Sequence, residues 1–272
     1  MTMTIKLIAI DMDGTLLNEH GDLNPETIKT VKEAKERGIK IVLCTGRPLM
    51  GIERFLPVLE LDQVGDYAIT YNGALVQHTA DGHVIAKHTL TYDDYLRIEY
   101  TARRLGVHSH AEDEKYIYTA NHDISRYTIH EVELVNMPLR FQTADQFDRG
   151  HIFSKVMLID EPDILAAAQQ KLPADFATDY YVVNSEPFYL EVLNKHANKG
   201  SGLASLAEHL GLTAAEVMAI GDQANDLTML EYADTAIAMG NAIPEVKAVA
   251  TAVTATNRED GVAQAIRHYA FN

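Results

Sequence analysis

The sequence contains a single cysteine, Cys44, and no long hydrophobic run. One cysteine excludes an intramolecular disulfide framework and a cysteine-rich zinc site, and it favours a reducing, cytoplasmic location. The N-terminal apolar run at 7–10 is too short for a signal-peptide core or a membrane span. We therefore expect no targeting segment and no membrane partner.

Basic residues are scarce, since 23 lysines and arginines face 39 acidic residues and the formal net charge is −16. Such a field repels polyanions, which argues against nucleic acid as a partner. An acidic protein that handles phosphate has to supply local positive charge from a metal ion, a few basic side chains or helix N-termini.

The 272 residues suffice for two compact units at roughly 150 residues per domain. At both ends of the chain, short apolar runs alternate with helical segments, which predicts a doubly wound parallel sheet with right-handed crossovers. Strands are expected at 6–10, 39–43, 217–220, 235–239 and near 252–254. Helices are expected to begin at Pro25, Pro48, about 199, about 225, after Pro244, and at Gly261.

The middle of the chain does not show this alternation. Strand-like stretches at 116–119, 153–159, 180–183 and 188–193 are interrupted by an amphipathic helix at 161–172. This order predicts an antiparallel α+β unit inserted into the α/β domain. The predicted boundaries are 1–84 and 194–272 for the core, and 85–193 for the insertion.

Two carboxylates, Asp11 and Asp13, follow the first predicted strand. Residues two apart at the end of an extended strand project from the same face, and ligands bind at the carboxyl ends of such strands. Adjacent buried carboxylates need a cation between them, and oxygen ligands suit Mg²⁺. An ordinary acidic turn at Gly14 is the alternative. A calcium-binding EF-hand is excluded, because Leu16 and Asp22 occupy the positions of its glycine and glutamate.

Thr45 and Gly46 follow the second predicted strand. A helix beginning there would offer a hydroxyl and backbone amides to a phosphate, although a simple loop with a threonine cap fits equally well. A cysteine-dependent phosphatase loop at Cys44 is excluded, because Met50 stands where that loop needs arginine.

Two further strand or helix ends carry candidate residues. Lys199 begins a helix, where the dipole disfavours a cation, so a bound phosphate or an ionised Asp11 should compensate. After the strand at 217–220, Asp222 could complete a metal site, and Asn225 could hydrogen-bond the phosphate or a ligand carboxylate. Asp226 could orient Lys199 or a metal-bound water. Each feature alone is also typical of a helix cap or a solvated lysine. Their recurrence at four places favours one shared site.

These segments resemble the four motifs of the haloacid dehalogenase-like phosphatase superfamily. The motifs are matched by 11–15, Thr45, Lys199 and 221–226. The insertion, together with Tyr-Asn-Gly-Ala at 71–74 and Asn-Lys-Gly at 198–200, is similar to the Cof-type branch and its YidA-like sugar phosphatases. The resemblance spans the whole chain. It implies a Rossmann-like core, a mobile α+β cap and magnesium-dependent hydrolysis of sugar phosphates and related small metabolites.

The resemblance also implies a role for each motif residue. Asp11 would be the nucleophile that forms an aspartyl phosphate, and Asp13 would be the general acid and base. The metal would be held by Asp11, the Asp13 main-chain carbonyl and Asp222. The phosphoryl group would be held by Thr45, the Gly46 amide, Lys199 and Asn225.

Two other functions remain open at this stage. A phosphotransferase or mutase would pass the same phosphoryl group to a second sugar, and a receiver-type module would only accept it. The substrate is not predicted, although several side chains of the insertion could face a sugar hydroxyl: His108, His110, Tyr116, Tyr118, Arg126 and Tyr127. Histidines two apart on a strand are more typical of a surface. The protein could be a monomer or a homodimer.

Overall fold

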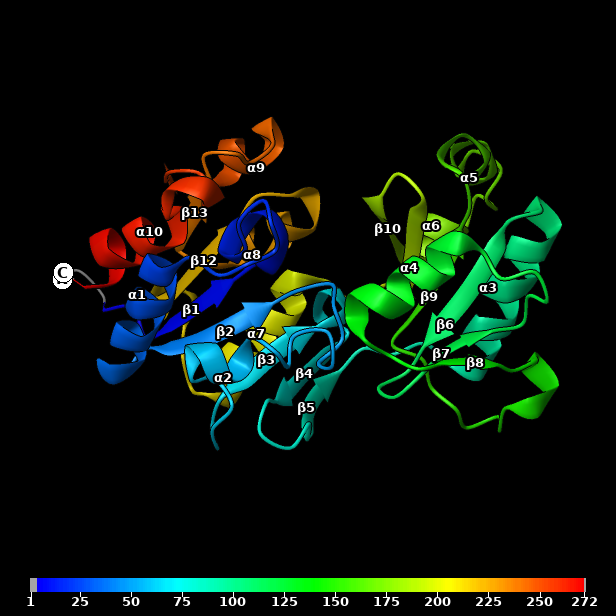
Figure 1. The fold of residues 1–272 in the computed structure, drawn as a ribbon, viewed down its shortest axis with the longest axis horizontal. Helices are drawn as coiled ribbons and strands as arrows, with labels where there is room; N and C mark the ends of the chain where they lie inside the picture. The colour runs from blue at the N-terminus through cyan, green and yellow to red at the C-terminus, as the bar shows by residue number, and fades with distance from the viewer. Residues whose placement is uncertain (1–3, 272) are drawn as a thin grey trace. The chain divides into compact units, whose positions relative to one another are not determined.

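The computed structural model describes residues 4–271, which form two compact units (Figure 1). The first unit contains the chain up to Thr45, then Glu53–Ala86, and the segment from Asn198 onward. The second contains Gly46–Ile52 and Lys87–Ala197. Among the helices of residues 4–271, none combines the length and the apolar character needed to cross a membrane.

The first unit is built on an eight-stranded sheet in the order β14-β13-β12-β1-β2-β3-β4-β5. Its strands are β1 (Leu7–Ile10), β2 (Lys40–Cys44), β3 (Tyr67–Thr70), β4 (Leu75–His78), β5 (Val84–Lys87), β12 (Val217–Gly221), β13 (Thr235–Ala238) and β14 (Ala252–Val253). The strands from β14 to β3 pair in parallel, and β4 runs antiparallel to β3. The predicted doubly wound parallel sheet is therefore confirmed.

The central strand β1 positions the site. Its four side chains are fully buried, and because successive side chains point to opposite faces, both faces of the sheet are covered. In register, Ile10 at its end lies opposite Leu43 of β2 and Ile220 of β12. The loops that follow these three strands therefore emerge side by side at the carboxyl edge of the sheet.

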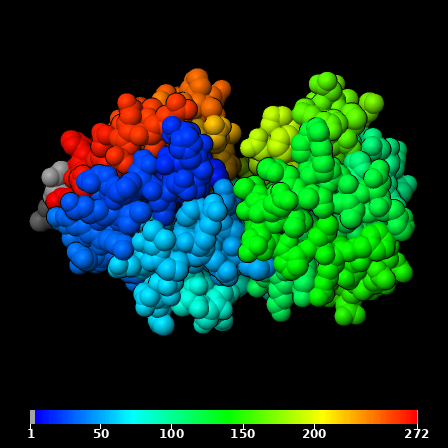
Figure 2. All heavy atoms as spheres, viewed as in Figure 1, coloured from blue at the N-terminus to red at the C-terminus, as the bar shows by residue number. Residues whose placement is uncertain are grey.

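Helices of the first unit form two groups. They are α1 (Pro25–Glu36), α2 (Leu56–Leu59), α7 (Lys199–His209), α8 (Leu227–Tyr232), α9 (Pro244–Val249) and α10 (Gly261–Ala270). One group joins α1 to α2 and α10, and the other joins α8 to α7 and α9. The blue surface of α1 adjoins the red surface of α10 in Figure 2. An ion pair between Glu26 of α1 and Arg267 of α10 joins the two helices. The two ends of the chain thus complete one layer together.

The helix predicted to begin at Pro48 is absent. The chain forms bends and turns from Gly46 to Phe55, and only the short α2 follows. Met50 from this segment packs against a small core of the second unit made by Ile117, Val135 and Met137. The packing of Met50, and not the local signal of Pro48, thus determines the conformation of this segment.

The second unit contains a six-stranded sheet in the order β10-β11-β9-β6-β7-β8. Its strands are β6 (His108–Glu112), β7 (Ile117–Thr119), β8 (Leu139–Phe141), β9 (Lys155–Ile159), β10 (Tyr180–Glu186) and β11 (Tyr189–Asn194). Its helices are α3 (Tyr92–Leu105), α4 (Arg126–Val135), α5 (Pro162–Gln169) and α6 (Phe176–Asp179). The pairing is antiparallel except between β7 and β8. The unit is therefore α+β, as the order of segments predicted.

One face of this second sheet buries a group of charged residues, which we call the Lys155 cluster. The Nζ of Lys155 lies 3.3 Å from Glu112, 3.1 Å from Glu131 and 3.5 Å from Glu191, and all four side chains are buried. His110 Nε2 lies 3.3 Å from Glu112 Oε1, but burial lowers the pKa of His110 to about 3, so its imidazole is neutral at pH 7. The expectation of a surface position is wrong for His110.

Candidate active site

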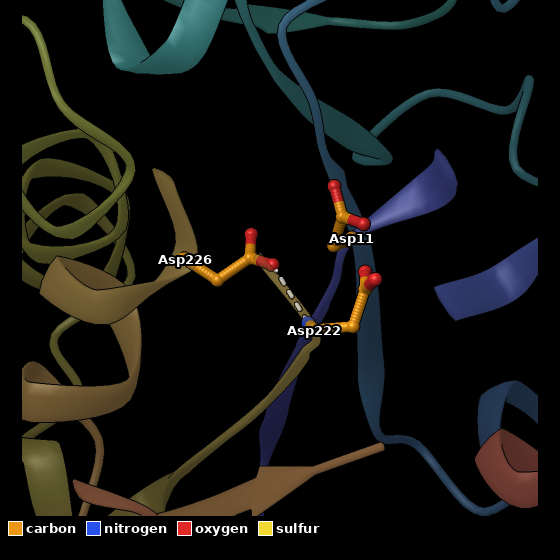
Figure 3. A group of neighbouring side chains, drawn as sticks. All are labelled: Asp11, Asp222 and Asp226. Carbon is orange, nitrogen blue, oxygen red and sulfur yellow. Dashed lines mark hydrogen bonds between the residues drawn. The ribbon is translucent and has the colours of Figure 1, made fainter. Parts of the chain in front are cut away.

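Three aspartates meet at the carboxyl edge of the first sheet. Asp11 follows β1, Asp222 follows β12, and Asp226 ends the loop that β12 begins. Carboxylate oxygens of the three lie within 4.8 Å of one another, and all three side chains are buried. Figure 3 shows the three carboxylates facing a common region, with that of Asp226 folded back toward the Asp222 amide.

The ammonium group of Lys199 joins two of these carboxylates. Its Nζ lies 2.5 Å from Asp11 Oδ1 and 2.6 Å from Asp226 Oδ1, and the side chain is fully buried. Lys199 is the first residue of α7, whose start is capped by the Asn198 side chain. Burial alone lowers the pKa of Lys199, but Asp11 and Asp226 outweigh it and raise that pKa above its ordinary value. The two carboxylates thus compensate the cation at the positive end of the helix.

Asp226 is held from both sides. Its Oδ2 accepts hydrogen bonds from the backbone amides of Asp222 and Gln223, at 2.8 and 2.9 Å, while its Oδ1 accepts from Lys199. A Cβ on Gly221 would lie 2.6 Å from the Asp226 carboxyl group, so glycine permits this return of the loop. Both oxygens of Asp226 are therefore engaged, and its contact with Lys199 places it to orient that side chain.

Asp222 is oriented by residues that sequence reasoning missed. The Thr15 hydroxyl donates to Asp222 Oδ1 at 2.9 Å, and Asn241 Nδ2 lies 3.4 Å from Asp222 Oδ2 and donates to the Gly14 carbonyl. Gly14 has a φ of +82°, and a Cβ there would lie 2.5 Å from Asp222. Thr15 stands within the first motif and Asn241 follows β13, so the strand-end argument could have found both.

The same-face argument for Asp11 and Asp13 is wrong in its geometry. The strand ends at Ile10, and residues 12–16 form a helical turn that is interrupted at Asp13 and Gly14. Asp11 is consequently buried, whereas the Asp13 side chain is exposed. The turn, and not a continued strand, determines where Asp13 lies.

The predicted phosphate-binding residues follow the two strands that flank β1. Thr45 directly follows β2 and is buried, and its backbone amide donates to the Ile69 carbonyl at 2.9 Å. Gly46 follows it directly. Asn225 is half-buried, and its Nδ2 donates to Asn72 Oδ1 at 3.1 Å. Asn72 thus contacts the predicted phosphate-binding residue Asn225, although the sequence analysis named Asn72 only as part of the motif at 71–74.

The charges of the site fit a divalent cation. Asp11, Asp222 and Asp226 set three carboxylates against the one ammonium group of Lys199, so full ionisation leaves two uncompensated negative charges. Burial, and then the charge of Asp226, raises the pKa of Asp11, and burial raises the pKa of Asp222 to about 6. A magnesium ion bound to these carboxylate oxygens would relieve that excess. The residues present therefore fit the metal that the sequence predicts.

The side chains singled out in the insertion are mostly engaged within the second unit. His108 Nδ1 lies 2.9 Å from Asp160, and the Tyr118 hydroxyl donates to Asp113 at 2.8 Å. Arg126 and Tyr127 both donate to Glu161, at 2.8 and 3.0 Å. These contacts identify no substrate-binding residue.

Comparison with known proteins defines the class. A profile of the haloacid dehalogenase-like hydrolase family matches residues 8–266. YxeH of Bacillus subtilis (strain 168), provisionally named a phosphatase, is 45% identical over 96% of this chain and 97% of its own length. YcsE of the same organism, named 5-amino-6-(5-phospho-D-ribitylamino)uracil phosphatase, is 33% identical over 97% of this chain and 96% of its own.

A solved structure shares the architecture of the whole chain. The crystal structure of a haloacid dehalogenase-like hydrolase from Bacteroides thetaiotaomicron superposes with a TM-score of 0.87 at 31% identity, covering 97% of this chain and 99% of that one. The chain therefore belongs to the haloacid dehalogenase-like hydrolase family, and the resemblance seen in its motifs is confirmed.

Proposed function

We propose that the protein is a magnesium-dependent phosphatase that hydrolyses sugar phosphates and related small metabolites through an aspartyl phosphate on Asp11. The observation that carries the proposal is the contact of the buried Asp11 carboxylate with Lys199, 2.5 Å away, beside Asp222 and Asp226. A carboxylate nucleophile needs compensation of the negative charge that an approaching phosphate brings, and the lysine provides it.

Each step then uses residues of this chain. An Asp11 oxygen attacks phosphorus, the bond from phosphorus to the ester oxygen breaks, and Asp13 gives its proton to the leaving alkoxide. Asp13 then takes a proton from water, which attacks the same phosphorus and releases phosphate and the Asp11 carboxylate. Held by Asp11, Asp222 and the Asp13 carbonyl, Mg²⁺ would supply charge neutralisation for the transferring group.

The phosphoryl oxygens would be held by four groups that differ in origin. Lys199 supplies a full charge, and Thr45, the Gly46 amide and Asn225 supply neutral donors. Phosphoryl transfer is catalysed mainly by such positioning and electrostatic stabilisation. The cap role of residues 85–193 and their control of specificity belong to this proposal.

Two observations support a small phosphorylated substrate. The net charge of −16 disfavours polyanionic substrates such as nucleic acid. The relative YcsE acts, by its name, on a phosphate carried by a ribityl chain, and another relative at 31% identity, YwpJ of Bacillus subtilis (strain 168), is named a phosphatase. We therefore propose phosphate monoesters of sugars or sugar alcohols as the substrate class.

The proposal is tested by measuring phosphate release from a panel of sugar phosphates, with Mg²⁺ and with a chelator. We expect turnover only with Mg²⁺, and a fall of at least about a thousandfold in Asp11→Asn. Asp81→Asn, which alters an exposed aspartate between β4 and β5, is the matched control. Retention of phosphate release in Asp11→Asn at wild-type thermal stability would show that the nucleophile is another group.

A further inference from the structure

The turn Tyr71–Gly73 adopts an unusual backbone conformation. Three successive residues have left-handed dihedrals, with φ of 51° at Tyr71, 52° at Asn72 and 90° at Gly73. Glycine and asparagine tolerate this region, but tyrosine rarely does. Tyr71 and Asn72 are also buried, to 1% and 2% exposure. Conformations of this kind persist only where surrounding contacts enforce them, and they are concentrated at functional sites.

The turn contacts three parts of the proposed phosphate site. It follows β3, the neighbour of β2, and the Asn72 amide donates to the Thr45 carbonyl at 2.9 Å. On another side, Gly73 lies against the start of α7, since a Cβ there would come within 2.0 Å of the Asn198 carbonyl oxygen and 3.2 Å of the Lys199 nitrogen. The left-handed path of the chain therefore brings Asn72 between Thr45 and the helix that carries Lys199.

The Asn72 side chain makes the third contact. Its Oδ1 accepts a hydrogen bond from Asn225 Nδ2 at 3.1 Å, across 153 residues of sequence. An amide group carries two hydrogens in a fixed plane, so using one of them on Asn72 sets the direction of the other. An Asn225 side chain without this partner would rotate among several orientations, and only some of them would direct a hydrogen at a phosphoryl oxygen.

We propose that Asn72 is a positioning residue, which holds the Asn225 amide in the orientation that binds the transferring phosphoryl group. The inference rests on the proposed phosphatase function. Asn72 acts through Asn225 with its side chain and through Thr45 with its backbone amide. The strained turn allows Asn72 to contact Thr45, which follows β2, and Asn225, which follows β12.

The substitution Asn72→Gly separates the side chain from the backbone. Glycine accepts a φ of 52° without strain and keeps the amide that donates to Thr45, so the backbone contact stays while the side chain and its hydrogen bond with Asn225 are lost. Asn136→Gly is the matched control, because Asn136 has a φ of 53° and is exposed at the end of α4. Both variants are expected to unfold thermally close to the unaltered protein.

Steady-state kinetics then test the positioning role of Asn72. We expect Asn72→Gly to lower kcat/KM by about tenfold and to raise the inhibition constant of inorganic phosphate, with Asn136→Gly unchanged. When Asn225→Ala is already present, Asn72→Gly should cost less than about twofold more, because the two residues act as one unit. Effects that add independently, or an Asn72→Gly variant as active as Asn136→Gly, would overturn the positioning role alone. Absence of phosphatase activity in the unaltered protein would overturn the proposed function, and the inference with it.

Discussion

Replacing Lys155 by methionine should destabilise the protein strongly, although this residue belongs to the second unit and not to the proposed active site. The substitution removes the cation that lies within 3.5 Å of Glu112, Glu131 and Glu191, in a place where all three are buried. Removing one partner from a buried ionic group typically costs about 3–5 kcal/mol, because the remaining charge is neither solvated nor paired.

The free energy needed to keep a buried carboxyl group protonated is of the same size. Burial already raises the pKa of Glu112, and the charge of Lys155 is the largest influence that lowers it. Without Lys155, one more carboxyl has to stay protonated in the folded state. For a glutamate whose unfolded pKa is about 4.3, this costs about 3.7 kcal/mol at pH 7 but only about 1 kcal/mol at pH 5.

The stability of Lys155→Met should depend on pH. A carboxyl whose folded pKa lies above its unfolded value favours folding below the unfolded pKa, and that advantage is lost as the pH rises through the folded pKa. Lys155→Met should therefore lose stability, relative to the unaltered protein, as the pH rises from 5 to 7. With about 2–4 °C per kcal/mol for a chain of this size class, the fall in Tm at pH 7 is roughly 10 °C.

Circular dichroism is the suitable assay, because the chain has no tryptophan. Thermal and urea unfolding would be followed at pH 5 and pH 7 for Lys155→Met and for Lys171→Met, in which an exposed lysine is replaced. Adding Glu112→Gln to Lys155→Met should recover part of the loss. Equal stability of the two lysine variants, or a loss that does not change between pH 5 and 7, would refute the reasoning.

Three further predictions concern other parts of the chain. Because burial lowers the pKa of His110 to about 3, the unfolded state takes up a proton below about pH 6.5 that the folded state does not, and His110→Gln should lose less stability than the unaltered protein in urea unfolding between pH 6.5 and 4. Gly73→Ala should lower urea stability by about 2 kcal/mol more than Gly211→Ala, because both glycines have positive φ but only the first would meet a backbone atom, the Asn198 carbonyl oxygen. Asp222→Asn should raise the Mg²⁺ concentration for half-maximal phosphate release by at least about tenfold, and an unchanged Mg²⁺ titration would show that Asp222 does not bind the metal.

Local patterns in the sequence were enough to predict five strands of the first unit, β1, β2, β12, β13 and β14, and the edge at which the candidate residues meet. The strands β3, β4 and β5 were not among those expected. The apolar run that became β1 is buried on both faces, and parallel strands necessarily end at the same edge of a sheet. Asp11 and Asp222 could therefore be placed near each other without coordinates. The assignment of catalytic roles to them stays a proposal.

Local signals failed where a distant segment determines the conformation. Pro48 is typical of a helix start, but its segment forms turns, and Met50 packs on the core of the second unit. The residues after Ile10 were predicted to continue the strand, but they turn at Gly14, which lies directly against Asp222. The surface position expected for His110 was wrong because α4 and the neighbouring strands cover that face.

The amino-acid sequence by itself determined which residues could form a phosphate and metal site, because strand ends, glycine turns and a lysine at a helix start are properties of short segments. Only the tertiary structure decided how these groups are oriented: Lys199 between Asp11 and Asp226, Thr15 on Asp222, and Asn225 on Asn72. The physical reason is the length scale of the interactions. Hydrophobic periodicity acts over a few residues, whereas these hydrogen bonds and ion pairs join groups that are close only after the chain has folded.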